Sequence, residues 1–382
     1  MVAPLRVAVD ARCLNTPHLR GMGKYVFEML AHADALADIE WRLYGERFDA
    51  PFQLPSLRRS AHEIFDLRGY RFHTWEQWGL PSRAVRGKRA DLLHATATTL
   101  PWWQPVPTVV TLHDTLPWQA THETAFERWY WQRLMPAALR RCAAVITISE
   151  SSRRDIESLW PVLADKLTVI PHGVADAYVD VAEADRPDIL REAVGDDPYV
   201  LYVGGAAEHK RFDWALQTFA AVHDRRVRLV AVGFAAREVD AARTRLPEAM
   251  QGRVHFLPFV AEDAMPQVYR HALATLYPTR YEGFGFPAVE SQAVGTPVMF
   301  SAVGSLGELV GPGAEVLPLD DLGSWQTVLR RLTTARSQQS PRAQRDAALA
   351  ARFSWSRSAA DHLTVYRRVR DRADAVSAPS SA

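Results

Sequence analysis

The sequence predicts an α/β protein of two doubly wound domains, each with a parallel sheet covered by helices. The chain has 382 residues, whereas a single hydrophobic core rarely grows beyond about 250–300 residues. Short β-branched runs alternate with longer amphipathic stretches, which is typical of a parallel sheet with helices on its faces. This alternation stops in an Asp-, Ala- and Pro-rich stretch over 174–198 and then starts again. We therefore expect domains over 1–177 and 178–354.

In the first half, short apolar runs bounded by charges or turn residues predict buried strands, and longer amphipathic stretches predict helices. The predicted strands are Val7–Val9, Thr108–Leu112, Ala144–Ile148 and Leu167–Ile170. The predicted helices are Gly23–Ala33, Ala125–Arg140 and Glu150–Leu159. Ser149 or Ser151 is expected to cap the last of these helices.

The same pattern continues in the second half, with a helix predicted from about Phe212 and a polar helical tail over Trp355–Arg372. The predicted strands are Tyr199–Val203, Arg228–Val232, Val254–Leu257, Leu273–Tyr277 and Pro297–Ser301. Ligands of open α/β sheets bind beyond the carboxyl ends of the strands. The loops that follow the strands are therefore expected to face a cleft between the two domains.

Composition excludes several classes of protein. The formal charge of +1, from 45 basic and 44 acidic residues, argues against a general nucleic-acid binder. Two cysteines far apart in sequence make neither a disulfide framework nor a metal cluster, and they suit a reducing cytoplasm. No apolar run approaches the roughly 18 residues of a spanning helix. We expect a cytoplasmic protein that binds no metal.

The most specific segment runs from Pro278 to Pro297 and contains Glu282, Gly283-Phe284-Gly285 and Glu290. Pro287 suits the first position of a helix, which would place Glu290 in the first turn and facing the cleft. The backbone N–H groups of the glycine loop would lie at the helix N-terminus, ready for an anion or for sugar hydroxyls. The alternative is that Glu290 only complements the helix dipole and that Glu282 is solvated.

This segment resembles the donor-site signature of glycosyltransferase family 4, whose members are retaining enzymes of the GT-B fold. The resemblance implies that Glu290 holds the ribose of a nucleotide sugar. It also implies that Glu282 contacts the transferred sugar, together with the amides of Gly283, Phe284 and Gly285.

Other segments resemble the same family. Gly21-Met-Gly23 resembles the glycine loop that approaches the donor phosphates, and His113 matches a histidine that positions the reacting sugar. The segment from Gly204 to Arg211 resembles the diphosphate clamp, in which Lys210 matches the family lysine. Many members carry an arginine at the position of Gly205. Here either Arg211 or Arg280 is expected to supply that charge.

Three further segments that match the family are interpreted as structural. Ser305 and Glu308 are spaced as a capping box at a helix start. His172, in the turn that ends the first half, receives no role. Phe353-Ser-Trp355 resembles the start of the final helix of the family, so a helix at about 355–375 is expected to cross back to the first domain.

The resemblance implies retaining transfer of a hexose, best matched by mannose from GDP-mannose, to a glycan or lipid-linked acceptor in cell-surface polysaccharide synthesis. It implies no cofactor. UDP-glucose and related donors remain open, as does oligomeric state. One alternative is a nucleotide-sugar epimerase of the GT-B fold, which needs no acceptor. Another is a non-catalytic, two-lobed sugar-binding protein.

Aromatic and basic residues alternate in two stretches of the first domain, Phe72–Arg89 and Phe126–Arg141. Such stretches can rest on an anionic bilayer that presents a lipid-linked acceptor. We therefore expect a possible peripheral contact with the inner face of the cell membrane. The alternative is ordinary helix packing with one solvated face.

Overall fold

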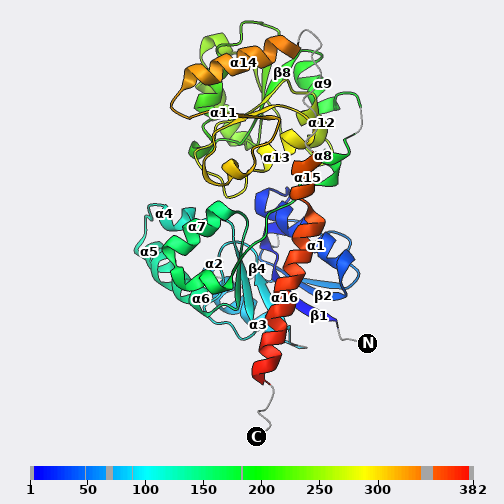
Figure 1. The fold of residues 1–382 in the computed structure, drawn as a ribbon, viewed down its shortest axis with the longest axis vertical. Coiled ribbons are helices and arrows are strands. Elements are labelled where there is room, and N and C mark those ends of the chain that lie inside the picture. The colour runs from blue at the N-terminus through cyan, green and yellow to red at the C-terminus, as the bar shows by residue number, and fades with distance from the viewer. Residues whose placement is uncertain are drawn as a thin grey trace. The chain divides into compact units, whose positions relative to one another are not determined.

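The structure is a computed structural model that describes residues 4–47, 49–65, 72–87, 89–181, 184–336 and 347–377. The chain divides into two units (Figure 1). The N-terminal unit comprises Met1–Gly173 with Trp355–Ala382, and the C-terminal unit comprises Val174–Ser354. The first division thus falls after Gly173, where the sequence analysis placed it after residue 177.

The N-terminal unit contains a seven-stranded parallel sheet in the order β3-β2-β1-β4-β5-β6-β7. Its strands are β1 (Leu5–Asp10), β2 (Ile39–Gly45), β3 (Ser60–Ile64), β4 (Leu92–Ala95), β5 (Thr108–Leu112), β6 (Ala144–Thr147) and β7 (Leu167–Val169). The strand order reverses between β1 and β4, so this pair forms the switch point of a doubly wound sheet. The four strands predicted for this half all lie in the sheet.

Helices cover this sheet, and two of them contain a π-helical turn. The helical segments are α1 (Gly21–Leu36), α2 (Phe72–Thr74), the π segment η2 (Trp75–Gly79), α3 (Leu80–Val85), α4 (Leu116–Gln119), α5 (Ala125–Trp129), the π segment η3 (Tyr130–Leu134), α6 (Met135–Arg141), α7 (Glu150–Leu159) and α16 (Trp355–Ser377). Ser149 caps α7 by accepting a hydrogen bond from the backbone N–H of Ser152. The final helix α16 returns to the N-terminal unit and packs along α1 (Figure 1).

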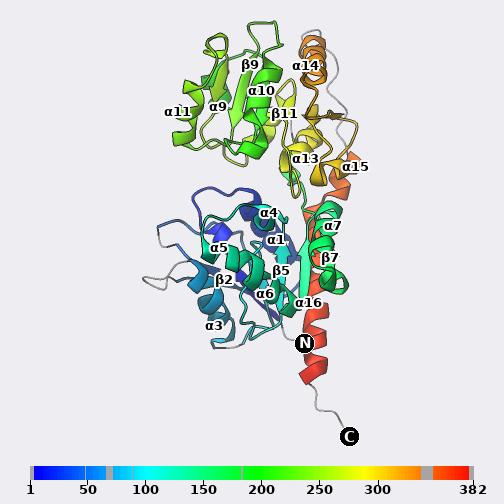
Figure 2. The same ribbon diagram turned by 90° about the vertical axis from the view of Figure 1, so that its left-hand side faces the viewer.

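The C-terminal unit contains a six-stranded parallel sheet in the order β10-β9-β8-β11-β12-β13. Its strands are β8 (Tyr199–Val203), β9 (Arg228–Val232), β10 (Val254–Phe256), β11 (Thr275–Tyr277), β12 (Val298–Phe300) and β13 (Ala314–Val316). All five strands predicted for this half are confirmed. The switch point lies between β8 and β11, which stand next to each other in the sheet. Figure 2 shows β9 and β11 of this sheet among the helices of the C-terminal unit.

Helices cover both faces of this sheet, so almost every residue of its inner strands is buried. The helices are α8 (Asp176–Val179), α9 (Asp188–Val194), α10 (Phe212–Phe219), α11 (Ala236–Thr244), α12 (Met265–Arg270), α13 (Phe286–Ala293), α14 (Leu322–Arg336) and α15 (Ala347–Arg352). Phe219 of α10 and Trp325 of α14 share one buried cluster with Leu229 and Leu276 of the sheet. Both predicted domains are therefore doubly wound α/β domains.

The chain leaves the N-terminal unit after Gly173 and returns to it at Trp355. A Cβ atom on Gly173 would overlap the backbone nitrogen of Trp355, so this turn admits only glycine without a shift of the backbone. On the other side of the division, the Val174 N–H donates to the Phe353 carbonyl at 2.8 Å. Among the described helices, none is long and apolar enough to cross a membrane.

Candidate functional site

In the C-terminal unit, the strand order brings two loops together at the switch point. The loop over 204–211 follows β8, and the loop over 278–285 follows β11. Backbone and side chain both join them, because the N–H of Arg280 donates to the His209 carbonyl at 2.8 Å and Thr279 Oγ1 donates to it at 3.2 Å. We call them the switch-point loops.

Each switch-point loop contributes one charge to an ion pair. Lys210 Nζ, at the end of the first loop, contacts the carboxylate of Glu282 in the second. The ammonium also lies 3.3 Å from Tyr277 Oη and 5.3 Å from the centre of the Tyr277 ring. The Lys210 and Glu282 side chains keep 20% and 13% of their surface exposed, so a ligand can reach both. The structure thus brings together two residues that the sequence analysis assigned to the donor.

Tyr277 was not predicted as a site residue. It ends β11 and is buried beneath the Lys210–Glu282 pair. Burial, followed by the nearby Glu282 carboxylate, raises the pKa of Tyr277 well above its usual value. The phenol therefore stays protonated and neutral at physiological pH.

Hydrogen bonds from Ser305 fix the backbone of the glycine loop that follows Glu282. Ser305 Oγ donates to the carbonyl oxygens of Phe284 at 2.7 Å and Glu282 at 2.9 Å. The prediction that Ser305 and Glu308 form a capping box is wrong, because residues Gly304–Glu308 form a 3₁₀ helix without a side-chain cap. The hydroxyl instead fixes the backbone that carries the amides of Gly283, Phe284 and Gly285.

Gly285 is the N-cap of α13 and has a φ of 103°. This conformation is open to glycine and rarely adopted by other residues, and a Cβ atom here would also overlap the Leu306 side chain. The helix begins at Phe286, so Pro287 occupies its second position and not its first.

Glu290 consequently lies in the second turn of α13, and its predicted place in the first turn is wrong. The residue is only 5% exposed. Tyr269 of α12, which the sequence analysis missed, donates its hydroxyl proton to Glu290 Oε2 at 2.9 Å. A buried carboxylate needs such partners. This hydrogen bond fixes the orientation of the carboxyl group.

Arg211 and Arg280, the two candidates for the positive charge that Gly205 lacks, differ in how firmly their side chains are held. The Arg211 guanidinium contacts the Asp213 carboxylate at 3.1 Å and lies over the Trp214 ring. The Arg280 side chain is 53% exposed and reaches Glu208 at 3.5 Å. Of the two, Arg280 is the freer to turn toward a bound anion.

Gly205 cannot readily carry a side chain in this unit. Its φ is +71°, and a Cβ atom would lie 2.6 Å from the Gly233 carbonyl oxygen. An L-residue at this position would be strained in both respects. The strain accounts in physical terms for the glycine found where many family members have arginine.

In the N-terminal unit, His113 follows β5 and is 7% exposed. Its Nε2 donates to the Thr96 carbonyl at 2.8 Å, which leaves the lone pair of the neutral ring on Nδ1. Burial lowers the pKa of His113 to about 4, so the ring is uncharged at neutral pH.

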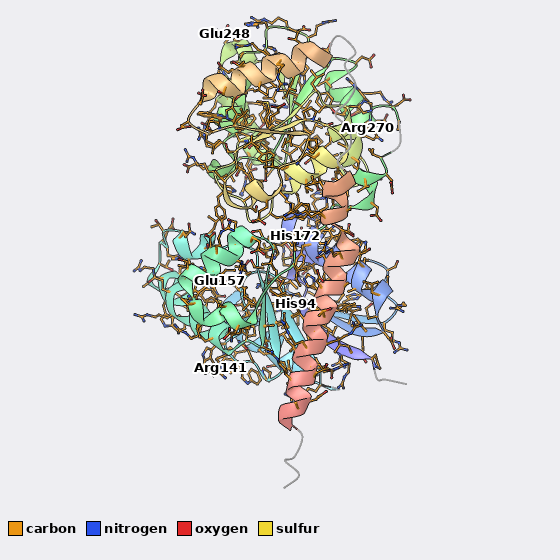
Figure 3. All side chains as sticks on the ribbon, in the orientation of Figure 1. His94, Arg141, Glu157, His172, Glu248 and Arg270 are labelled. Atoms are coloured by element: carbon orange, nitrogen blue, oxygen red, sulfur yellow. The ribbon has the colours of Figure 1, made fainter. Side chains whose placement is uncertain are left out.

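His113 belongs to a cluster of buried rings from both ends of the chain, which we call the histidine cluster. Its members are Tyr25, His94, His113, His172, His362 and Tyr366. His172, which was assigned no role from the sequence, packs between Tyr25 and Trp355 with its ring tilted to both. Figure 3 shows His94 and His172 beside α16.

Hydrogen bonds connect the histidine cluster. The Tyr25 hydroxyl lies 2.8 Å from Thr111 Oγ1 and 2.9 Å from His362 Nε2. The Tyr366 hydroxyl lies 2.7 Å from His94 Nδ1. These contacts tie α1, the sheet and α16 into one buried polar network.

The predicted glycine loop lies at the start of α1, which begins at Gly21, two residues before the predicted start. A Cβ atom on Gly23 would lie 2.7 Å from the Cys13 carbonyl oxygen, whereas one on Gly21 would meet nothing within 4 Å. Gly23 is therefore needed for close packing, and Gly21 lies at the open N-terminus of the helix. Within the described residues, no group of three or more His, Cys, Asp or Glu side chains is arranged to hold a metal ion.

Solved structures share this architecture. Sucrose-phosphate synthase from Thermosynechococcus elongatus superposes with a TM-score of 0.73 at 18% identity, covering 96% of this chain and 99% of that one. Anabaena Alr3699/HepE in complex with UDP-glucose superposes with a TM-score of 0.67 at 18% identity, covering 97% and 99%. The fold is the GT-B fold of glycosyltransferases.

Sequence comparisons narrow this class. A model described as Glycosyltransferase Family 4 matches residues 19–178, and one described as Glycosyl transferases group 1 matches residues 197–334. The O-antigen chain mannosyltransferase RfbU of Salmonella typhimurium is 22% identical over 320 residues, which are 82% of this chain and 87% of that protein. The chain belongs to glycosyltransferase family 4.

Proposed function

We propose that the protein is a retaining, metal-independent hexosyltransferase that transfers mannose from GDP-mannose to a glycan or lipid-linked acceptor during polysaccharide assembly. The similarity to RfbU, an O-antigen chain mannosyltransferase, supports mannose as the transferred sugar and a polysaccharide as the product. The observation that carries the proposal is the meeting of Lys210 and Glu282 on the switch-point loops, close to the start of α13. A cation and a helix N-terminus together favour a diphosphate.

In this proposal the bond between the anomeric carbon and the diphosphate oxygen breaks, and the acceptor hydroxyl attacks from the same face. The departing phosphate takes the proton of that hydroxyl, so the nucleoside diphosphate leaves protonated and no other base is needed. Lys210 and the amides at the start of α13 stabilise the charge that develops on the phosphate. Lys210 would have to turn from Glu282 toward the phosphate, which would free Glu282 to accept hydrogen bonds from the transferred sugar.

The family resemblance supports the remaining roles. Glu290 accepts hydrogen bonds from the ribose hydroxyls, and Arg280 adds the charge that Gly205 cannot carry. On the N-terminal unit, His113 positions the transferred sugar as a neutral ring. The amide at Gly21 approaches the phosphates, whereas the Gly23 N–H donates to the Arg20 carbonyl at 2.6 Å and supports the start of α1. The exposed Trp78 and Trp129 of this unit support a peripheral contact between the acceptor side and a membrane surface.

The Glu290→Ala variant tests the donor site. In the parent protein, GDP or GDP-mannose at 100 times its Kd is expected to stabilise by about 2.7 kcal/mol, seen as a rise in Tm. The variant is expected to lose this rise. Glu248→Ala, which removes an exposed carboxylate of the same unit (Figure 3), is the control and should keep it. A full rise in Tm with GDP in Glu290→Ala would contradict the assignment of Glu290 to the ribose. In the parent protein, a larger rise in Tm with UDP-glucose than with GDP-mannose would identify UDP-glucose as the donor.

The Tyr269→Phe variant tests whether the buried hydroxyl orients Glu290. A hydrogen bond to a charged group contributes about 1.5–3 kcal/mol, so GDP is expected to bind about ten- to hundredfold more weakly. A 2′,3′-dideoxy analogue of GDP should bind the variant and the parent equally, because its ribose has no hydroxyl to orient. Tyr199→Phe is a matched control, since Tyr199 is a buried tyrosine that donates to the Val268 carbonyl at 2.6 Å. Equal losses for GDP and its dideoxy analogue would mean that Tyr269 is only structural.

A further inference from the structure

A pocket of about 310 Å³ opens on the N-terminal unit, formed by the two π-helical segments and the chain after β4. We call it the aromatic pocket. Its aromatic lining includes Trp78, Trp102, Trp103, Phe126 and Trp129. Trp78, Trp102 and Trp129 are the only exposed tryptophans among the described residues, and all three line this one pocket. Clustered exposed apolar side chains mark interaction sites.

A buried polar network holds the walls of the aromatic pocket in place. Glu76, in the π segment η2, is fully buried and accepts hydrogen bonds from Tyr130 of the other π segment and from Thr99. The Arg12 guanidinium lies 3.4 Å from the same carboxylate. Single π-helical turns are rare and often occur at functional sites. The network makes the pocket a built feature and not a chance gap between helices.

Two polar groups at the pocket, the Gln77 amide and the Tyr130 hydroxyl, already have partners in the protein. The Gln77 amide nitrogen donates to Glu76 at 2.8 Å and to the Leu100 carbonyl at 3.2 Å, and its oxygen accepts from the Trp102 N–H at 2.7 Å. The Tyr130 hydroxyl donates its proton to Glu76. A sugar needs hydrogen-bonding groups that point at its hydroxyls, whereas a hydrocarbon needs only apolar surface. With Gln77 and Tyr130 engaged, most of the remaining lining is the apolar surface of aromatic rings, which favours a hydrocarbon guest.

Positive charge lies beside this apolar surface. The Arg141 guanidinium lies 4.9 Å from the centre of the Trp102 ring, and Arg141 is exposed (Figure 3). The helix that supplies Phe126 and Trp129 also carries exposed arginines at 128, 133 and 140. Its one acidic residue is Glu127, which is engaged in a capping box with Thr124. The balance favours an anionic group next to the hydrocarbon.

We propose that the aromatic pocket binds the hydrocarbon chain of a lipid phosphate, with Arg141 receiving the phosphate, and that this lipid is the carrier of the acceptor. The identification of the lipid as an acceptor carrier rests on the proposed glycosyl transfer. The binding of an alkyl phosphate does not, so the two can fail separately.

The test is calorimetric titration of the full chain with octyl, decyl and dodecyl phosphate, each below its micelle-forming concentration. Each methylene buried from water is expected to strengthen binding about fourfold until the pocket is filled. Inorganic phosphate alone should not bind measurably. Trp78→Ala and Trp129→Ala change exposed side chains and should each weaken dodecyl phosphate at least tenfold. Phe259→Ala removes an exposed aromatic ring of the C-terminal unit and should have no effect.

Several results would overturn the proposal. Affinity that does not rise with chain length, or an equal loss in Phe259→Ala, would exclude a hydrocarbon site in the pocket. Binding of methyl α-mannoside that is lost in the tryptophan variants would make the pocket a glycan subsite. Binding to phosphatidylcholine vesicles with phosphatidic acid, but not to monomeric dodecyl phosphate, would make the region a bilayer-resting surface without chain capture.

The rise in Tm on adding GDP distinguishes failure of the pocket assignment from failure of the donor site. If GDP stabilises the parent and both tryptophan variants equally while dodecyl phosphate fails to bind, the pocket assignment alone is wrong. If dodecyl phosphate binds as expected but no nucleotide stabilises the protein, the donor site is wrong and the pocket assignment stands.

Discussion

Lys210→Ala is expected to lower kcat by about 10²–10³-fold with little change in KM, because removing one group that stabilises developing charge has an effect of this size. The Lys210 ammonium is the only cation of the switch-point loops that contacts Glu282 within the described residues. Without it, the departing diphosphate would keep the amides at the start of α13 but lose its nearest positive charge. The measurement is the initial rate of nucleoside diphosphate release at saturating donor and acceptor.

Arg211→Ala is the matched control for Lys210→Ala. The two cations are adjacent in sequence, but Arg211 is already engaged with Asp213 and with the Trp214 ring. We expect its removal to lower kcat by less than tenfold. If the two variants lost activity equally, or if Lys210→Ala raised KM alone, Lys210 would be a ground-state binding residue and the proposed role in departure of the phosphate would be wrong.

Acidification from pH 7 toward pH 4 is expected to destabilise the N-terminal unit more than the C-terminal unit. Burial lowers the pKa of His113 and of His362 to about 4, and it lowers the pKa of His94 and of His172 well below the usual value. Unfolded histidines have a pKa of about 6.5. Between these values the unfolded chain binds more protons than the folded one, so stability falls as the pH falls.

Each histidine is expected to lower the free energy of unfolding substantially in acid, and Asp10 offsets part of this loss. A shift from about 6.5 to about 4 corresponds to roughly 3 kcal/mol for each of His113 and His362. Asp10 acts in the opposite direction, because burial raises its pKa to about 6 and its folded form gains a proton first. One carboxyl group offsets only part of the contribution of four histidines, so the net effect of acid is destabilising.

Urea unfolding followed by tryptophan fluorescence measures this loss. All the tryptophans except Trp214 and Trp325 belong to the N-terminal unit, so the signal reports mainly on that unit. His362→Gln, which cannot gain a proton, should flatten the pH dependence between pH 6.5 and 4 while lowering stability at pH 7. Stability that is constant from pH 7 to pH 5 in the parent protein would contradict the prediction.

The sequence predicted the fold because most strands are short, β-branched and fully buried. It missed β2, β3, β4 and β13. The alternation of Ile39, Trp41 and Leu43 with polar residues in β2 is a signal that was overlooked, whereas β3 and β4 lack one. β3 reads Ser-Ala-His-Glu-Ile and lies exposed at the edge of its sheet, so neither apolar content nor alternation distinguishes it from a loop. β4 has four residues, of which His94 is buried through hydrogen bonds to Thr111 and Tyr366. Such burial depends on tertiary partners that a local pattern does not contain.

Only those residues of the candidate site that belong to a family motif could be predicted from the sequence. Lys210 and Glu282 were found through the family signature, and their proximity follows from the strand order at the switch point. Tyr269 and Tyr277 were not found, and Ser305 was given a different role, because each acts through a contact with a residue distant in sequence. The capping box failed for the same reason, since Ser305 Oγ meets the carbonyls of a loop about twenty residues earlier and leaves no cap to form.

The return of α16 to the N-terminal unit has a consequence for how the protein is made. The C-terminal unit is one uninterrupted stretch, whereas Tyr366 and His362 of the N-terminal core are synthesised last. Domains on a growing chain usually fold from the N-terminus onward. In this protein the second unit can finish folding while Tyr25 and His94 of the first unit still lack their partners on α16. That unfinished core is where a ribosome-bound chaperone would be needed.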